Sequence, residues 1–348
     1  MPETESSAAR IRVSNGWQGT LKLAPGLVLA TLVAVGALLV AQILPATLGP
    51  VLMAVVLGMI IGNAATLPEA TKAGIGFAAK KLLRLGVILL GARLTFGDIV
   101  EVGGVAVGVV VLGMTVAFLT VAAASKLVGI SPRLATLIGV GTAVCGNSAI
   151  MATAPIIDAE DREISFSVAT ITIFGTFALL LFPLIGHALD LPDRVFGFWA
   201  GLSINDTAQV VAAGAAYSNE ALDVAAIVKL VRNALMAPLI LIIAWWAARQ
   251  EATKPGADVR GSALKAFPLF VLGFLALATA QSFGVFPEEV VETLSFGSTL
   301  FITIAIGAVG LSTKIADLRR VGIKPFVVGL GAATALALVG FWLATLLG

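Results

Sequence analysis

The chain has few of the residues on which most enzymes and metalloproteins depend. It contains one cysteine, Cys145, and one histidine, His187. A single cysteine excludes an intramolecular disulfide, and one residue of each type excludes a Cys/His metal cluster within one chain. The cysteine count leaves the redox compartment open.

Charge is also scarce. Of the 348 residues only 12% are charged and 59% are hydrophobic, and the mean hydropathy is +1.04. A soluble protein of this size cannot bury so much apolar surface, so the composition predicts an integral membrane protein with lipid as a partner. The polar head runs directly into an apolar stretch longer than a signal-peptide core. We therefore expect a cytoplasmic tail over 1–22 and a single transmembrane domain over 23–348.

A bilayer core needs roughly 20 apolar residues per helix, and charged or Pro/Gly-rich breaks divide the chain into about eleven such segments. The sequence thus predicts an all-α polytopic protein of about eleven transmembrane helices. The predicted spans are 26–44, 48–63, 82–96, 103–124, 133–157, 166–187, 195–216, 223–248, 266–284, 293–312 and 325–347.

The basic residues indicate the orientation. When the spans alternate from a cytoplasmic N-terminus, Arg93 and Arg162 fall outside, Lys229 and Arg232 fall within a span, and the rest of the 22 basic residues lie inside. Positive charge concentrates on the cytoplasmic side of membrane proteins. We expect an inner-membrane protein with a cytoplasmic N-terminus and a periplasmic or extracellular C-terminus.

Two stretches of the chain align with each other. GTAVCGNSAIMAT at 141–153 matches GLSINDTAQVVAA at 201–213, with polar residues at the same place in both. A fainter match pairs 91–103 with 310–322. Internal repeats, often inverted, are typical of secondary transporters, whose substrate sites lie at the repeat interface near the bilayer midplane.

Both stretches of the first pair favour interrupted helices. Glycine lowers helix propensity, and Ser, Thr, Asn and Asp compete for main-chain hydrogen bonds. Such a break is tolerated in a membrane only where it is buried in protein or lines a cavity. The predicted break residues are Gly141, Cys145 and Gly146. The predicted hydrogen-bonding residues for a solute are Asn147, Ser148, Asn205, Thr207 and Gln209.

Three ionisable residues lie within the predicted spans. Asp206 is costly at the bilayer centre, so we interpret it as the residue that couples transport to an ion. Lys229 and Arg232, at i and i+3, share one helix face and are predicted to contact an anion. The alternative interpretations are that the polar residues only link helices, and that the two cations extend to an interface. Cys145 has no acid–base partner in view.

In order and spacing, TAVCGNSAI, FWAGLSINDTAQVVAAG (198–214), VKLVRNALMAP (228–238) and LLRLGVILLGARLT (82–95) resemble the YeiH family of bacterial multi-pass membrane proteins. The resemblance covers nearly the whole chain from about residue 25. It implies an inner-membrane location, a distant kinship with cation/proton antiporters and bile-acid symporters, crossing broken helices, and a proposed link to sulfate export. The family motif often reads ICGAS, whereas this chain has Asn147 before Ser148. A second crossing element near 295–300 is an alternative.

The function predicted first is secondary active transport of a small anion, such as sulfate or a sulfonate in the export direction, coupled to H⁺ or Na⁺. A cation/proton antiporter is the alternative, and a membrane-embedded enzyme using Cys145 or Asp206 is a third class. The sequence has no phosphate-binding loop and no nucleic-acid patch, so we expect no cofactor and no nucleic-acid partner. With one cysteine, one histidine and no visible catalytic group of residues, we also expect no metal site and no enzymatic activity. A homodimer is left open.

Overall fold

The computed structural model describes residues 3–43, 50–250, 270–314, 316 and 322–347. Every element of secondary structure in these residues is a helix, which confirms the predicted all-α class. The α-helices are α1 (Glu3–Ala41), α2 (Pro50–Ala64), α3 (Glu69–Phe77), α4 (Leu83–Leu90), α5 (Phe96–Val128), α6 (Pro132–Ala143), α7 (Asn147–Thr153), α8 (Asp161–Ala188), α9 (Asp193–Ser203), α10 (Thr207–Tyr217), α11 (Asn219–Ala234), α12 (Met236–Gln250), α14 (Phe270–Ser282), α15 (Glu288–Ser312) and α17 (Ile323–Leu347).

The chain folds into two compact units. The first contains Met1–Gly86 and Gly297–Lys314, and the second contains Val87–Phe296 and Ile315–Gly348. We describe each unit by itself. The single transmembrane domain over 23–348 stays a prediction.

Six helical stretches in the described residues are long and apolar enough to cross a bilayer. They are Lys22–Ala41, Phe96–Val128, Asp161–Ala188, Asn219–Trp246, Glu288–Ser312 and Ile323–Leu347. Helices α2 and α14 are apolar but shorter. The chain is therefore a polytopic membrane protein, while the exact number of its spans stays a prediction.

The segments predicted to cross the membrane at 133–157 and 195–216 are each two helices, α6 with α7 and α9 with α10. Each pair folds back: Ser131 before α6 bonds Glu163 at the start of α8, and Tyr217 at the end of α10 donates to the carbonyl oxygen of Leu191 before α9 at 2.5 Å. The prediction that each segment crosses in one direction was therefore wrong.

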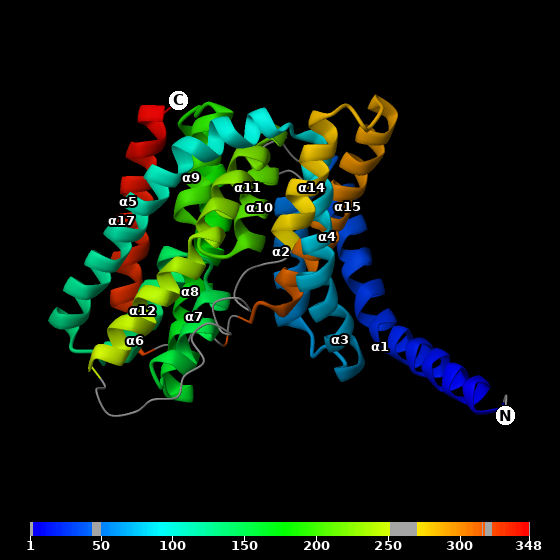
Figure 1. Cartoon of the computed structure of the whole chain (residues 1–348), viewed down its shortest axis with the longest axis horizontal. Helices are drawn as coiled ribbons and strands as arrows, with labels where there is room; N and C mark the ends of the chain where they lie inside the picture. The colour runs from blue at the N-terminus through cyan, green and yellow to red at the C-terminus, as the bar shows by residue number, and fades with distance from the viewer. Residues whose placement is uncertain (1–2, 44–49, 251–269, 315, 317–321, 348) are drawn as a thin grey trace. The chain divides into compact units, whose positions relative to one another are not determined.

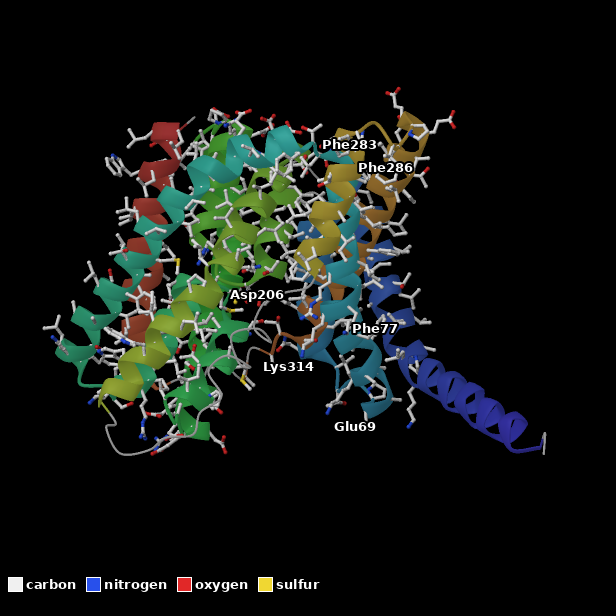
Figure 2. The ribbon with its side chains drawn as sticks, in the orientation of Figure 1. Glu69, Phe77, Asp206, Phe283, Phe286 and Lys314 are labelled. Atoms are coloured by element: carbon white, nitrogen blue, oxygen red, sulfur yellow. The ribbon has the colours of Figure 1, made fainter. Side chains whose placement is uncertain are left out.

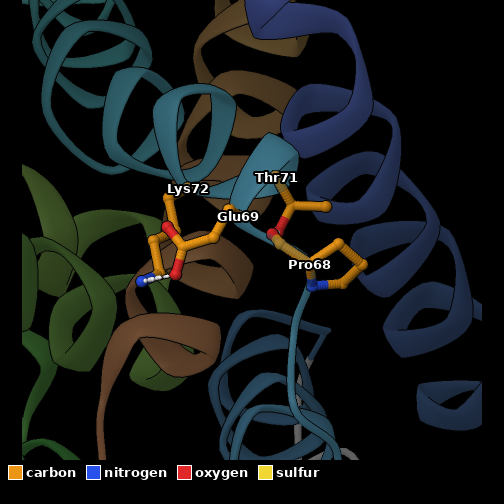
Figure 3. Close-up of polar contacts among 4 residues, drawn as sticks. All are labelled: Pro68, Glu69, Thr71 and Lys72. Atoms are coloured by element: carbon orange, nitrogen blue, oxygen red, sulfur yellow. Dashed lines mark hydrogen bonds and ion pairs between the residues drawn. The ribbon is translucent and has the colours of Figure 1, made fainter.

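Helix α3 begins earlier than the third predicted span. It starts at Glu69 after Pro68, and continues through a π-helical turn, Ala78–Leu82, into α4. The hydroxyl of Thr71 donates to the carbonyl oxygen of Pro68 at 2.7 Å, and Lys72 pairs with Glu69 on the exposed side (Figure 3). The acidic residue in the first turn favours the positive helix end. Charged residues had interrupted the apolar run, so hydropathy placed the start at residue 82.

In the first unit, glycines allow helices to approach closely. A Cβ atom added to Gly58 of α2 would lie 2.4 Å from the carbonyl oxygen of Gly307 on α15. A Cβ atom on Gly26 of α1 would lie 2.1 Å from the carbonyl oxygen of Thr71 on α3. These contacts place main chain against main chain, which is typical of helix packing in membranes.

The corner between α5 and α6 in the second unit follows from local sequence. Helix α5 ends at Gly129, whose φ of 69° is the left-handed conformation that glycine adopts without strain. The Ser131 hydroxyl then accepts from the amide of Leu134 at 3.1 Å, and Pro132 occupies the first helical position. Both features are strong signals for a helix start. They fix where α6, the first helix of the broken pair α6 and α7, begins.

Helix α9 packs closely against α11 in the second unit. Gly197 and Gly201 lie one turn apart on α9, and a Cβ atom at either would lie 2.6 or 2.7 Å from Val224 or Val228 of α11. On another face, the indole of Trp199 donates to the carbonyl oxygen of Ala337 on α17 at 2.9 Å. Figure 1 shows α17 beside α5 as well. The two glycines therefore allow the C-terminal half of α11 to lie against the C-terminal end of α9.

Candidate functional site

The first break separates α6 from α7. Val144 leaves the helix with φ −119° and ψ −94°, and Gly146 has φ 64° and ψ −125°, a conformation that L side chains rarely adopt. The amide of Gly146 donates to the carbonyl oxygen of Gly141 at 3.0 Å. Gly141, which was predicted to be part of the break, instead lies in the last turn of α6 against Ile150. The break is Val144–Gly146, because only there does the main chain leave helical geometry.

The second break separates α9 from α10. Ile204 is extended, with φ −80° and ψ 137°, and Asp206 is the N-cap of α10. The Asp206 carboxylate accepts from the amide of Ala208 at 2.8 Å, while the Gln209 side chain accepts from the amide of Asp206 at 3.3 Å. This is a capping box, in which two main-chain donors at the helix start are satisfied reciprocally.

The two breaks occupy equivalent positions in the aligned stretches. Asn147 and Thr207, which the alignment pairs, are the first residues of α7 and α10. The breaks also meet: a Cβ atom on Gly146 would lie 3.7 Å from the carbonyl oxygen of Asn205. Helix α15 is continuous through 295–300, so the alternative crossing element has no break there. That the chain is an inverted repeat stays a prediction.

Two positively charged side chains of α11, Lys229 and Arg232, lie at this meeting point. Lys229 is 1% exposed, and its ammonium donates to the carbonyl oxygens of Val144 at 2.7 Å, of Ile204 at 3.3 Å, and of Asn205. One ammonium group thus contacts both breaks. We call the set formed by Val144–Gly146, Ile204–Asp206, Lys229 and Arg232 the break junction.

Arg232 is also 1% exposed and spans the same two helices. It donates to the carbonyl oxygens of Thr142 at 2.7 Å, Ala143 at 3.2 Å, Gly201 at 3.0 Å, Leu202 at 2.6 Å and Ile204 at 2.9 Å. The last carbonyl groups of a helix have no partner within it and form the negative end of its dipole. Arg232 and Lys229 therefore satisfy the C-terminal ends of α6 and α9, and within the described chain their partners are main-chain oxygens.

Helix α8 contacts one amide side chain from each broken helix. Asn147 donates to the hydroxyl oxygen of Thr172 at 3.4 Å, and Gln209 donates to that of Thr176 at 3.4 Å. Between them, Gly175 leaves room for Gln209, whose amide oxygen would lie 1.9 Å from a Cβ atom there. The predicted residues Asn147 and Gln209 are thus held from the same face of α8.

The other predicted residues differ in exposure. Asp206, which Figure 2 labels about midway along the helices of its unit, is half-buried, as is Thr207. Ser148 is exposed and Asn205 is buried. Cys145 is buried, and its thiol donates to the sulfur of Met236 at 3.2 Å. His187 lies in the last turn of α8, stacked on Tyr217.

Sequence reasoning missed three residues near the break junction. Thr172 and Thr176 of α8 contact predicted residues, and Asn233 of α11 donates to the Thr207 hydroxyl oxygen at 3.3 Å. Asn233 directly follows Arg232, so its position beside a buried cation was the available signal. Threonine gives a weaker signal, since its hydroxyl often bonds its own helix, as Thr176 also does with the carbonyl oxygen of Thr172 at 2.8 Å.

Several buried oxygen atoms at or beside the junction have no hydrogen-bond partner among the residues that the structure describes. These are the side-chain oxygens of Thr142, Asn147, Asn205 and Asn233. Buried polar atoms without partners are rare in native proteins and call for an explanation such as a bound ion or water. Besides stabilising two helix ends through Lys229 and Arg232, the junction therefore offers oxygen atoms that could bind an ion, a water or a solute.

The fold and the junction define a polytopic helical membrane protein with two interrupted helices joined by buried cations. The family described as Conserved hypothetical protein 698 matches residues 25–329. A UPF0324 membrane protein of Corynebacterium glutamicum is 35% identical over 92% of each chain. The UPF0324 inner membrane protein YeiH of Salmonella typhi is 35% identical over 88% of this chain and 89% of its own. A UPF0324 membrane protein of Clostridium tetani is 32% identical over 94% of this chain and 98% of its own.

The chain belongs to this family of UPF0324 membrane proteins, which includes YeiH, and the predicted resemblance is confirmed. No solved structure matches the chain. The kinship with antiporters and symporters implied by the resemblance stays a prediction.

Proposed function

We propose that this protein is a secondary active transporter of a small anion in the bacterial inner membrane, with the break junction as its solute site. The observation that carries the proposal is the meeting of two interrupted helices with two buried cations and one carboxylate. Non-helical main chain within a membrane is tolerated where it is buried or lines a cavity. Transporters use such broken helices to bind solutes and ions near the midplane.

The charges of the junction support an anion. Lys229 and Arg232 are buried, and Asp206 is the carboxylate of the junction. Two positive charges face one negative charge, so an anion would improve the balance that buried charges require. Sulfate or a sulfonate exported from the cell is the specific solute that the family resemblance implies.

The geometry changes the expected role of the two cations. Because Lys229 and Arg232 donate to main-chain carbonyl oxygens, they would act on an anion through their field rather than as direct ligands. Direct contacts would come from the more accessible side chains of Asn147, Ser148 and Thr207. Asp206, half-buried at the start of α10, is the residue proposed to couple transport to H⁺ or Na⁺.

A cation/proton antiporter is the second candidate. The observation that favours it is the group of buried oxygens around the junction that have no partner in the described residues, since oxygen acceptors suit a cation. The enzyme alternative has less support, because the Cys145 thiol contacts Met236 and the His187 ring stacks on Tyr217.

Transport in proteoliposomes tests the proposal. Wild-type protein is expected to exchange labelled sulfate or a small sulfonate across the membrane and to accumulate it when an H⁺ or Na⁺ gradient is imposed. Asp206→Asn keeps an N-cap residue but removes the charge, so exchange should persist while gradient-driven accumulation is lost. Arg194→Ala, at the opposite end of α9 from the second break and in a pair with Glu101, is the control and should behave like wild type.

Two outcomes would overturn parts of the proposal. Normal gradient-driven accumulation by Asp206→Asn would remove Asp206 from coupling. Failure to move any sulfur, carboxylate or halide anion, together with Na⁺-dependent pH changes inside the vesicles, would replace the anion transporter with the antiporter.

A further inference from the structure

The unpaired oxygens beside α10 point to a bound cation. We propose that Asn205, Asp206 and Asn233 bind a small monovalent cation, and that this cation is Na⁺. The inference rests on the proposed transporter, because it makes Na⁺ the ion whose gradient drives the anion.

Asn233 supplies the first observation. Its side chain is 3% exposed, and its amide nitrogen donates to the Thr207 hydroxyl oxygen at 3.3 Å. This contact places the Asn233 amide at Thr207, the first residue of α10, which directly follows Asp206 in the chain. The Asn233 amide oxygen is buried and accepts no hydrogen bond from the described part of the chain.

Asn205 supplies the second observation, from a different element. It directly precedes Asp206, it is 3% exposed, and its amide oxygen also lacks a partner within the described ranges. Its main-chain carbonyl oxygen already accepts from Lys229. The second break thus presents a buried neutral oxygen on Asn205 and a half-buried carboxylate on Asp206. Asn233 of α11 contacts Thr207, the next residue in the chain.

The charged donors of the break junction and the amide of Ala208 already have acceptors. Lys229 donates to three carbonyl oxygens and Arg232 to five. The amide of Ala208 donates to Asp206 itself. Among the described residues the two amide oxygens have no partner, and an atom that can satisfy oxygens in several directions at once is a cation.

The type of oxygen selects the cation. Amide and carboxylate oxygens are hard ligands, which suit alkali and alkaline-earth ions rather than soft metals. One carboxylate beside two buried cations offers little charge for a divalent ion. A proton on Asp206 would leave the amide oxygens of Asn205 and Asn233 unpaired, whereas Na⁺ would bind all three.

The buried cations also connect this site to the anion. Na⁺ would add a third positive charge to the surroundings of Lys229 and Arg232, so it should bind more tightly when an anion is present. By thermodynamic linkage, Na⁺ must then strengthen anion binding by the same factor. Na⁺ and the anion would therefore bind together, which is the requirement for a coupled carrier.

Thermal unfolding of the purified full-length protein in detergent tests the site. At constant ionic strength and pH, NaCl should raise the melting temperature in a saturable way relative to KCl and N-methyl-D-glucamine chloride. Asn233→Ala and Asp206→Asn should remove the Na⁺-specific shift. Asn63→Ala, an equivalent substitution on α2, should retain it. Direct binding of ²²Na⁺ by the wild-type chain provides a measurement that does not depend on how well the variants fold.

The outcomes separate this site from the proposed function. Equal melting temperatures in Na⁺, K⁺ and N-methyl-D-glucamine, with no ²²Na⁺ binding, would overturn the cation site even if anion flux is observed. A stabilisation that follows pH alone would also overturn it in favour of a proton. Specific Na⁺ binding without any anion flux would support the cation site and reject the anion transporter.

Discussion

Lys229 of α11 lies with its ammonium nitrogen 2.7 Å from the carbonyl oxygen of Val144, where α6 ends. The same ammonium contacts Ile204 and Asn205 at the end of α9. A single side chain therefore stabilises the negative ends of two helix dipoles. Any movement of one broken helix relative to the other within this unit would have to exchange these hydrogen bonds, which makes α11 central to the predictions that follow.

Replacing Arg232 should destabilise the protein strongly. Arg232→Ala leaves five buried carbonyl oxygens without their charged donor, so we expect a loss of at least about 3 kcal/mol. Arg232→Lys should lose less, because it keeps the charge but not the planar group. Thermal or denaturant unfolding in detergent measures the effect. Arg194→Ala, which removes a pair with Glu101 that is partly exposed, should cost about 1 kcal/mol or less. Equal losses in the two alanine variants would contradict the role of Arg232.

The charge and the capping function of Asp206 can be separated. Because asparagine is as good an N-cap as aspartate, Asp206→Asn should change the stability of the protein little when Na⁺ is absent. Asp206→Ala removes the acceptor for the amide of Ala208 and should cost about 0.5–2 kcal/mol. Unfolding measurements on the pair of variants check this. If both variants lose the same stability, capping is not what the carboxylate contributes.

Gly146 should not tolerate a side chain. Its φ of 64° with ψ of −125° is strained for any L residue, so Gly146→Ala should cost about 1–3 kcal/mol and impair transport. Gly76→Ala is the matched control, because a Cβ atom there meets nothing within 4 Å and its helix should gain about 0.5–1 kcal/mol. Melting temperatures of both variants give the comparison. An unchanged Gly146→Ala protein would mean that the break has another conformation.

The close approach of α2 and α15 gives a prediction for the first unit. Gly58→Ala would place a Cβ atom 2.4 Å from the carbonyl oxygen of Gly307, so we expect a loss of about 1–3 kcal/mol. Gly36→Ala has its nearest contact, a Leu57 side-chain atom, at 4.0 Å and should be tolerated. Expression level and unfolding in detergent are the measurements. Tolerance of both substitutions would show that the two helices can separate.

The charge distribution predicts the orientation of the termini. A fluorescent protein fused at the N-terminus should fluoresce in the cytoplasm, and alkaline phosphatase fused after Gly348 should be active in the periplasm. An inactive C-terminal phosphatase, with a fluorescent reporter active there instead, would mean that the number of spans is even. The N-terminal fusion serves as the internal control in the same cells.

The position of the two breaks was predictable from sequence because it depends on local residues. Gly146 and Asp206 interrupt otherwise apolar spans, and the alignment of 141–153 with 201–213 places them opposite each other. The structure puts them at corresponding points, directly before Asn147 and Thr207. Side-chain chemistry and helix propensity were sufficient for this part of the site.

The partners of the buried cations were not predictable in the same way. Helical spacing correctly gave Lys229 and Arg232 a common direction, but it could not show that main-chain oxygens lie there. Carbonyl groups are freed wherever a helix ends, and no residue letter records them. The start of α3 at Glu69 was missed for a related reason: a helix with charges on one face does not register as an apolar run.

The contact between Cys145 and Met236 has a practical consequence for chemical labelling. Cys145 is the only thiol in the chain, and it is 6% exposed. Maleimide reagents should therefore react slowly with the wild-type protein under native conditions. A cysteine introduced at a chosen surface position would then be labelled selectively without first removing the natural one, so accessibility from either side of the membrane can be mapped in an otherwise unaltered protein.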